Sequence, residues 1–385
     1  MSRMQRETVF TNARVVLSDR VIDGSVVIRG AQIAAVDTGK SRLDAAIDLG
    51  GDILCPGLVE LHTDNLEKHF SPRPGVQWPP ASAVVAHDSQ IVAAGITTVF
   101  DALAVGDIRA DSDRLRDLES MAESVTRASE AGYLSAEHRL HIRCEVSCET
   151  LSDLLTAFND HPLVGLISMM DHTPGQRQFL EESRYRDYYR DKWAVGDEDI
   201  DAFIARQKTL DGVHTDRNRK LVSALCREHR LPLASHDDAA IAHVEEAFAL
   251  GATVSEFPTT PEAARAAKEH GLQVVAGAPN LVRGESHSGN VAVRDLAAEG
   301  LVDILSSDYV PTSLIHAAYR MHQDDAIGLP LHEALATVTR APARAVGLLD
   351  RGEISPGLSA DLLWIRQTED VPLVRGVWRR GIRIG

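Results

Sequence analysis

Short apolar runs that end in polar residues recur through the middle of the chain. The first run, residues 53–59, precedes His62 and Asp64, and seven later runs end at Asp101, Glu145, His172, Asp238, Glu256, Asn280 and Asp308. Alanine-rich stretches with scattered charges separate several of these runs, at residues 112–131, 216–228, 239–250 and 261–270. Strands that alternate with helices predict a parallel sheet, and eight such units within about 250 residues predict a (β/α)8 barrel of the TIM type.

The two ends of the chain carry a different pattern. Residues 8–37 and 357–384 contain short alternating segments that are separated by glycine and polar residues. Such segments predict strands joined by turns. We therefore expect an α/β protein in which a small β-sandwich module, built from residues 1–55 and 352–385, flanks a barrel formed by residues 56–351.

Composition limits the class of protein. The chain has 385 residues, of which 44% are hydrophobic and 25% charged, and a formal net charge of −16. This charge repels polyanions, so we expect no nucleic-acid partner and no binding to a membrane surface. No apolar run approaches the about 18 residues of a membrane span and the start lacks an apolar signal core, which predicts a cytoplasmic protein. The four cysteines lack C-x-x-C spacing and are expected to be reduced and packed.

His62 and Asp64 follow the first apolar run directly. Because they lie two residues apart on a strand, their side chains share a face and can hold a metal ion at two points. Imidazole and carboxylate together suit Zn²⁺ or Mn²⁺. In a TIM-type barrel the carboxyl ends of the strands meet at one mouth. Each such residue alone is more often a capping or solvent-facing group, but metal-competent residues follow six of the eight strands: His62 and Asp64, Glu145, His172, His236, Glu256 and Asp308.

With this layout the chain resembles the amidohydrolase superfamily over essentially its whole length. One branch is matched more specifically, by residues 62–78 (His-Thr-Asp-Asn-Leu-Glu-Lys-His-Phe-Ser-Pro-Arg-Pro-Gly-Val-Gln-Trp) together with residues 140–146, 169–176, 234–238, 255–260 and 280–290. These stretches are similar to the PhnM family, the α-D-ribose 1-methylphosphonate 5-triphosphate diphosphatases of the carbon–phosphorus lyase pathway. The resemblance implies hydrolysis of the ribose 5-triphosphate arm to a 5-phosphate, with release of pyrophosphate.

Two residues depart from the usual pattern of the superfamily. Asp64 stands where the second histidine of an H-x-H pair is usual, and Glu256 stands where the sixth strand usually ends in histidine. Both changes add oxygen and negative charge, which widens the choice of metal towards Mn²⁺.

The resemblance, taken with these residues, implies a metal-dependent phosphoanhydride hydrolase. One or two divalent ions, most often Zn²⁺ with Mn²⁺ as the other candidate, are expected to bind His62, Asp64, Glu145, His172, His236 and Asp308. Asp308 is the expected catalytic base, and His172 is either a ligand or a proton donor. Contacts to the phosphorylated ribose are expected from Asn65, Lys68, His69, Arg73, Glu256, Asn280, Arg283, Ser286, His287 and Asn290.

Three questions stay open from the sequence. Residues 176–197, rich in arginine and tyrosine, suit either a lid over the mouth or the contact of a homodimer. The same barrel and metal also serve deaminases and N-acyl hydrolases, from which the basic stretch after Asp64 distinguishes this chain. A barrel that serves only as a non-catalytic scaffold is a third possibility, but it would have no need of so many clustered charges.

Overall fold

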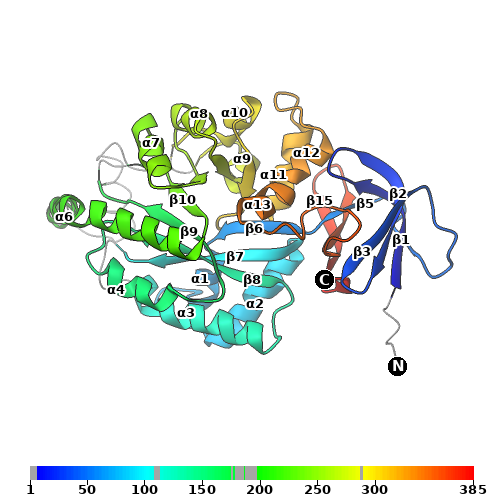
Figure 1. Ribbon diagram of the computed structural model, residues 1–385, viewed down its shortest axis with the longest axis horizontal. Coiled ribbons are helices and arrows are strands. Elements are labelled where there is room, and N and C mark those ends of the chain that lie inside the picture. Colours follow the sequence, from blue (N-terminus) through cyan, green and yellow to red (C-terminus); the bar gives the residue numbers. More distant parts are fainter. Residues whose placement is uncertain (1–6, 108–112, 175–176, 178–185, 187–196, 287–288) are drawn as a thin grey trace.

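Two separate sheets organise the computed structural model, which describes residues 7–107, 113–174, 177, 186, 197–286 and 289–385 (Figure 1). One sheet has eight parallel strands in sequence order: β6 (Leu58–Thr63), β7 (Ile96–Val105), β8 (Glu137–Glu145), β9 (Val164–Met170), β10 (Leu233–His236), β11 (Val254–Glu256), β12 (Gln273–Gly277) and β13 (Ile304–Ser306). The predicted (β/α)8 barrel is therefore confirmed.

The barrel closes between its first and last strands through a few contacts at their carboxyl ends. Thr63 and Asp308 form a parallel bridge. The amide of Asp64 donates to the carbonyl of Asp308 at 2.9 Å, and the amide of Asp308 donates to the carbonyl of His62 at 3.1 Å. The hydrogen bonds that close the barrel thus hold together the backbone of three residues that were predicted to bind metal.

Helices surround the strands on the outside of the barrel (Figure 1). In chain order they are α1 (Asn65–Phe70), α2 (Pro80–Ala93), α3 (Asp113–Glu130), α4 (Leu151–Leu155) followed by the 3₁₀ turn η1 (Thr156–Phe158), α6 (Asp197–His229), α7 (Ile241–Ala249), α8 (Pro261–Glu269), α9 (Ala278–Arg283), α10 (Val293–Ala298), α11 (Ser313–Gln323), α12 (Leu331–Ala336) and α13 (Arg340–Ala345). The stretches predicted at residues 112–131, 239–250 and 261–270 correspond to α3, α7 and α8. Helix α6 begins well before the predicted residue 216; Ile200, Phe203 and Ile204 stand at helical spacing in its first half, a signal that the prediction did not use.

The second sheet combines both ends of the described chain. Its strands are β1 (Glu7–Val16), β2 (Val21–Arg29), β3 (Gln32–Thr38), β4 (Ile47–Asp48), β5 (Ile53–Pro56), β14 (Leu362–Gln367), β15 (Pro372–Arg379) and β16 (Ile382–Arg383). Strand β5 pairs with β1 on one side and with β14 on the other, which joins the two chain ends. Phe10 and Trp378 meet edge to face, 4.8 Å apart, in the apolar core of this sheet.

The apolar run at residues 53–59 was expected to be one strand, but it divides at Gly57 into β5 of the second sheet and β6 of the barrel. Gly57 lies against the barrel strand β7, where a Cβ atom would come within 2.4 Å of the Thr97 hydroxyl. Its amide donates to the carbonyl of Asp361 at 2.9 Å. Only glycine allows the chain to pass this closely between the two sheets.

A strand that was expected to end at Asn280 ends at Gly277 instead, and Asn280 lies in α9. Pro279 falls in the first turn of that helix, a position that suits proline. No helix in the described part of the chain combines the length and the apolar character needed to cross a membrane.

Candidate metal and phosphate site at the barrel mouth

Three predicted metal ligands gather where the barrel closes. His62 is the next-to-last residue of β6, Asp64 follows that strand, and Asp308 follows β13. The ligand atoms of the three residues all lie within 4.8 Å of one another. The His62 Nε2 atom is 3.7 Å from the Asp64 Oδ1 atom. Asp308 has a left-handed backbone, with φ of 52°, which is uncommon for a residue other than glycine. Such backbone is retained where the surrounding contacts fix it, as the hydrogen bonds that close the barrel do here.

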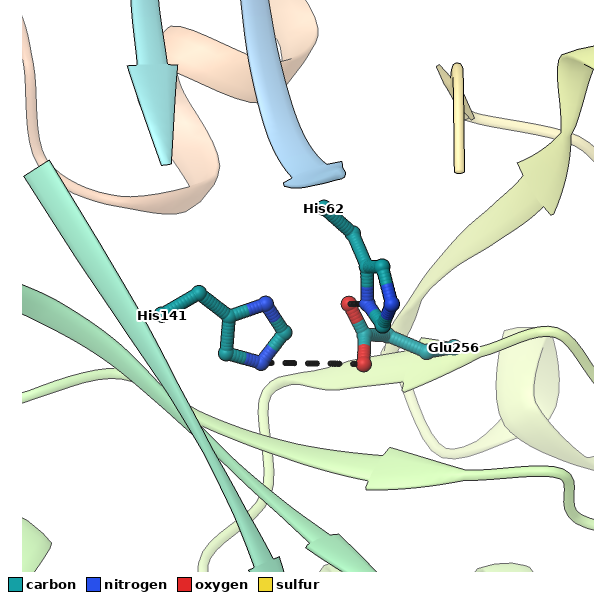
Figure 2. A group of neighbouring side chains, drawn as sticks. All are labelled: His62, His141 and Glu256. Atoms are coloured by element: carbon teal, nitrogen blue, oxygen red, sulfur yellow. Dashed lines mark hydrogen bonds and ion pairs between the residues drawn. The ribbon is translucent and has the colours of Figure 1, made fainter. Parts of the chain in front are cut away.

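Glu256, at the end of β11, orients two of the histidines. Its carboxylate contacts the His62 Nδ1 atom at 3.1 Å and, with its other oxygen, the His236 Nδ1 atom at 3.2 Å. A carboxylate accepts from both, so each imidazole carries its proton on Nδ1 and keeps the lone pair on Nε2. Figure 2 shows the first of these contacts, with the His141 ring on the other side of Glu256, its Nε2 atom 3.8 Å from the carboxylate.

Burial keeps these imidazoles neutral. Desolvation lowers the pKa of His62, His141 and His236 to about 3 each. Neutral imidazole is the form that binds a metal, and a carboxylate on the far nitrogen is the usual way in which proteins orient such a ligand. His62 and His236 therefore have the protonation and the orientation of metal ligands.

Glu145 and His172 form a second pair at the mouth. The His172 Nδ1 atom lies 2.6 Å from one Glu145 oxygen, and Ser147 donates to the other oxygen at 2.7 Å. Burial lowers the pKa of His172, but the charge of Glu145 and this hydrogen bond outweigh it, so that the pKa is raised. The His172 and His236 rings lie 6.4 Å apart, which places this pair beside the first group of ligands.

Acidic side chains crowd the mouth. Burial, and then the charge of Asp64, raises the pKa of Asp308 to about 7, and burial raises the pKa of Asp237 to about 6. In β6, two residues before His62, burial raises the pKa of Glu60 to about 7. Arg143 faces this group and contacts the Asp64 Oδ1 atom at 2.6 Å. Clustered carboxylates next to oriented imidazoles are what a divalent cation requires, so the residues present fit such an ion.

Several residues that were expected to contact the substrate have other partners here. Glu256 lies behind the histidines with none of its surface exposed. The Asn280 side chain spans from the carbonyl of Val291 to the amide of Val293, at 3.1 and 3.0 Å. The Asn65 amide points at α2, where its nitrogen lies 3.0 Å from the His87 Nδ1 atom. Tertiary contacts that the sequence did not reveal thus engage the polar atoms of Glu256 and Asn280 and the side-chain nitrogen of Asn65.

The remaining predicted contacts lie nearer the surface. Lys68 donates to the carbonyl of Tyr309, the residue after Asp308, and its ammonium lies 5.3 Å from the Tyr309 ring centre. His69 contacts Gln90 at 3.0 Å. Arg73 and Arg283 are exposed, Ser286 and Asn290 are half-buried, and His287 lies outside the described residues.

Two residues of β8 were missed as members of the site, although the pattern contained them. His141, Arg143 and Glu145 alternate along the strand, so their side chains share one face. The His141 Nδ1 atom contacts the carbonyl of Leu61 at 3.0 Å, and its Nε2 atom contacts the hydroxyl of Ser168 at 2.8 Å. Side chains two residues apart on a strand share one face, so counting back from Glu145 in steps of two would have identified both residues.

Most of the insertion at residues 176–197 lies outside the described residues, so its role as a lid or a dimer contact stays a prediction. Arg177 is described and is buried. Its guanidinium contacts the Asp238 carboxylate, and it donates to the carbonyl of His236 at 3.3 Å. This end of the insertion is therefore fixed directly behind a predicted metal ligand.

Comparison with known proteins places this geometry in context. Residues 193–382 match the family model described as "Amidohydrolase family". The chain is 46% identical to α-D-ribose 1-methylphosphonate 5-triphosphate diphosphatase of Escherichia coli (strain K12), over 98% of this chain and 100% of the relative. It is 24% identical to adenine deaminase of Desulfatibacillum aliphaticivorans, over 98% of this chain and 58% of the relative. Among solved structures, N-acetylglucosamine-6-phosphate deacetylase from Pasteurella multocida shares the fold, with a TM-score of 0.64, 14% identity, and coverage of 98% of this chain and 100% of that one.

Proposed function

The chain belongs to the amidohydrolases, and within them to the α-D-ribose 1-methylphosphonate 5-triphosphate diphosphatases, and we propose that it hydrolyses this ribose triphosphate to the 5-phosphate and pyrophosphate. The observation that carries the proposal is the 46% identity over 98% of this chain and 100% of the relative. The geometry of the barrel mouth is consistent with it, because a hydrolase of phosphoanhydrides needs a proton acceptor and a means to offset phosphate charge at one place.

The donor set supports one or two divalent ions. His62, Asp64 and Asp308 would hold one, and Glu145, His172 and His236 offer a second set of donors beside it. Three imidazoles favour Zn²⁺, while the carboxylates make Mn²⁺ the other candidate. When bound, such an ion lowers the pKa of a coordinated water and offsets charge on phosphoryl oxygens.

Asp308 is the proposed general base. Its carboxylate would take the proton of the water that attacks the α-phosphorus, and the bond from that phosphorus to the bridging oxygen would break so that pyrophosphate leaves with the bond electrons. Burial, and then the charge of Asp64, raises the pKa of Asp308, which favours proton transfer to its carboxylate. The closed barrel fixes its position, because backbone hydrogen bonds on both sides tie it to β6.

Cations near the mouth would bind the phosphates. Lys68 is exposed and donates to the backbone carbonyl of Tyr309, the residue after Asp308. Its ammonium can exchange this carbonyl for a phosphate oxygen of the substrate without leaving the site. Arg283, at the end of α9, is exposed and offers a bidentate fork. In a chain with a net charge of −16, such local cations are needed to hold a polyanionic substrate.

Pyrophosphate release tests this proposal. Purified protein, reconstituted with Zn²⁺ or Mn²⁺, is mixed with ribose 5-triphosphate species, and pyrophosphate and monophosphate are measured separately. Equal amounts of pyrophosphate and 5-phosphate are expected, and chelation should abolish both. Release of single phosphates would refute the proposal. Deamination of adenine or deacylation of an N-acyl sugar, without hydrolysis of the triphosphate, would refute it in favour of another activity of the same barrel.

A further inference from the structure

A buried polar network lies outside the barrel mouth, between α2 and strands β7 and β8. Asp101 of β7 contacts the His87 Nε2 atom at 2.7 Å and, with its other oxygen, the His138 Nδ1 atom at 2.8 Å. The His138 Nε2 atom lies 3.2 Å from Asp88 of α2. His87 and Asp101 have no exposed surface, and His138 is 3% exposed. Two histidines and two aspartates have the composition of a metal site. The hydrogen bonds among them show whether their ring nitrogens are free to bind an ion.

The hydrogen bonds account for the ring nitrogens without an ion. Both nitrogens of His138 face carboxylates, so both donate and the ring is an imidazolium; burial opposes this charge, but the two aspartates outweigh it and raise its pKa. Asp88 also accepts from the amides of Ser135 and Ala136. His87 donates from Nε2 to Asp101, which leaves its Nδ1 atom as an acceptor. A metal would have to displace these bonds, so the network holds protons and a fixed tautomer.

The acceptor of His87 points at Asn65, the residue after Asp64. The Asn65 side-chain nitrogen lies 3.0 Å from the His87 Nδ1 atom and 2.9 Å from the Gln90 Oε1 atom. The same nitrogen is also 3.3 Å from the His69 Nε2 atom, which itself lies 3.0 Å from the Gln90 Oε1 atom and donates there. An amide nitrogen has two hydrogens, and His87 and Gln90, one turn apart on α2, lie at the shorter distances and take one each. The Asn65 amide therefore has a single orientation.

Asn65 opens α1, the short helix that connects the metal ligands to the predicted phosphate contacts. The backbone before it is fixed by the bond from the Asp64 amide to Asp308, and Lys68 lies less than one turn after it. Leu66 and Phe70 pack this six-residue helix into the apolar core, but how its first residue is turned toward Asp64 depends on a polar anchor. The hydrogen bonds from Asn65 to α2 supply that anchor.

We infer that His87 and Gln90 are positioning residues, which hold the Asn65 amide and thereby set how α1 presents Asp64 and Lys68 to the substrate. The buried Asp101 and His138 keep His87 in the tautomer that this role requires. The inference rests on the proposed function, because it names residues that position the groups of that reaction without touching the substrate.

Two substitutions of His87 separate positioning from stability. In His87→Asn the side-chain oxygen takes the place of Nδ1 and can still accept from Asn65, but the contact to Asp101 is lost. In His87→Gln the amide nitrogen takes the place of Nε2 and still donates to Asp101, but the acceptor for Asn65 is lost. We expect His87→Asn to have the lower melting temperature and at least about ten-fold higher kcat/KM for pyrophosphate release than His87→Gln. A purely structural role predicts that the less stable variant is also the less active, and that result would overturn the inference.

Gln90→Ala tests the same anchor at an exposed helical position, where the fold is not at risk. We expect a loss of about three-fold or more in kcat/KM at an unchanged melting temperature, while Ser89→Ala on the same helix changes neither. Activity of Gln90→Ala equal to that of the wild type would overturn the inference even if both His87 variants failed to fold.

The tautomer of His87 can be read without substrate, by ¹⁵N NMR of histidine-labelled protein. We expect a protonated Nε2 and an unprotonated Nδ1. The opposite tautomer would remove the acceptor for Asn65 and overturn the inference. Failure of the wild type to release pyrophosphate would instead refute the proposed function, and this signal would still report on the anchor.

Discussion

Replacing Glu256 by glutamine should weaken metal binding although Glu256 touches no metal in the proposed site. Its two oxygens accept from the Nδ1 atoms of His62 and His236, at 3.1 and 3.2 Å. Glutamine of the same shape offers one oxygen and one NH₂ group, so it can accept from only one of the two rings. The other ring must move its proton from Nδ1 to Nε2, and it then presents N–H where a metal needs a lone pair.

The size of the effect follows from this change. Loss of a carboxylate behind a ligating histidine costs about 10- to 100-fold in metal affinity, which corresponds to about 1.4–2.7 kcal/mol. The metal-free protein should change much less in stability, since each buried nitrogen of the altered pair still finds a partner after the proton moves. Weak metal binding in a protein of nearly normal stability is therefore the expected signature.

Competition between the metal-free protein and a chromophoric chelator for Zn²⁺ measures this affinity directly. Glu137→Gln is the matched control: Glu137 begins β8 and pairs with Arg351 at 2.8 Å, away from the proposed ligands. It should lower the free energy of unfolding and leave the metal affinity unchanged. A Glu256→Gln protein that bound Zn²⁺ as tightly as the wild type would show that this carboxylate does not set the tautomers of His62 and His236.

Three further outcomes are expected. Asp308→Asn, folded and loaded with metal, should keep less than about a tenth of the wild-type kcat, and a higher value would remove Asp308 as the base. Lys68→Ala and Arg283→Ala should leave the melting temperature nearly unchanged yet each cost about 1.5–3 kcal/mol in kcat/KM; the loss should shrink for an analogue that carries only a monophosphate, and equal losses on both substrates would assign them to the other end of the substrate. His138, whose pKa is raised from 6.5 to about 9 because the charges of its two aspartate partners outweigh burial, should stabilise the fold by about 3 kcal/mol below pH 6.5, and this contribution should disappear as the pH rises through about 9. Urea unfolding between pH 6 and pH 10 measures it, and His138→Gln with the same pH dependence as the wild type would contradict it.

The barrel could be predicted because its signal repeats. Each strand is an apolar run followed by a polar residue, and eight repeats in one order leave few topologies to consider. At two places where the prediction of elements failed, the cause was a tertiary contact. The division at Gly57 depends on how closely Thr97 approaches, and the helical state of Asn280 depends on a side chain that spans to Val291 and Val293.

Residue type predicted which side chains gather at the mouth better than it predicted their partners. His62, Asp64 and Asp308 meet because barrel topology alone brings the ends of first and last strands together. Glu256 also reaches the mouth, but its position behind two imidazoles depends on the length of its side chain and on the rotation of both rings. These are properties of the packed structure, so a sequence in which Glu256 replaces a usual histidine could not show that it orients ligands.

The exchange of a second histidine for Asp64 illustrates how such a departure becomes compatible with a buried site. A carboxylate at this position adds a negative charge close to Asp308, and like charges at that distance raise the free energy of the ionised pair. Arg143, two strands away on β8, contacts the Asp64 oxygen at 2.6 Å, and its side chain is only 8% exposed. A histidine at position 64 would leave this buried guanidinium without the carboxylate that it contacts, which is costly for a charge removed from water. Asp64 and Arg143 are therefore best understood as one unit, in which the arginine offsets the charge of the carboxylate at the same oxygen, Oδ1, that lies 3.7 Å from the His62 Nε2 atom.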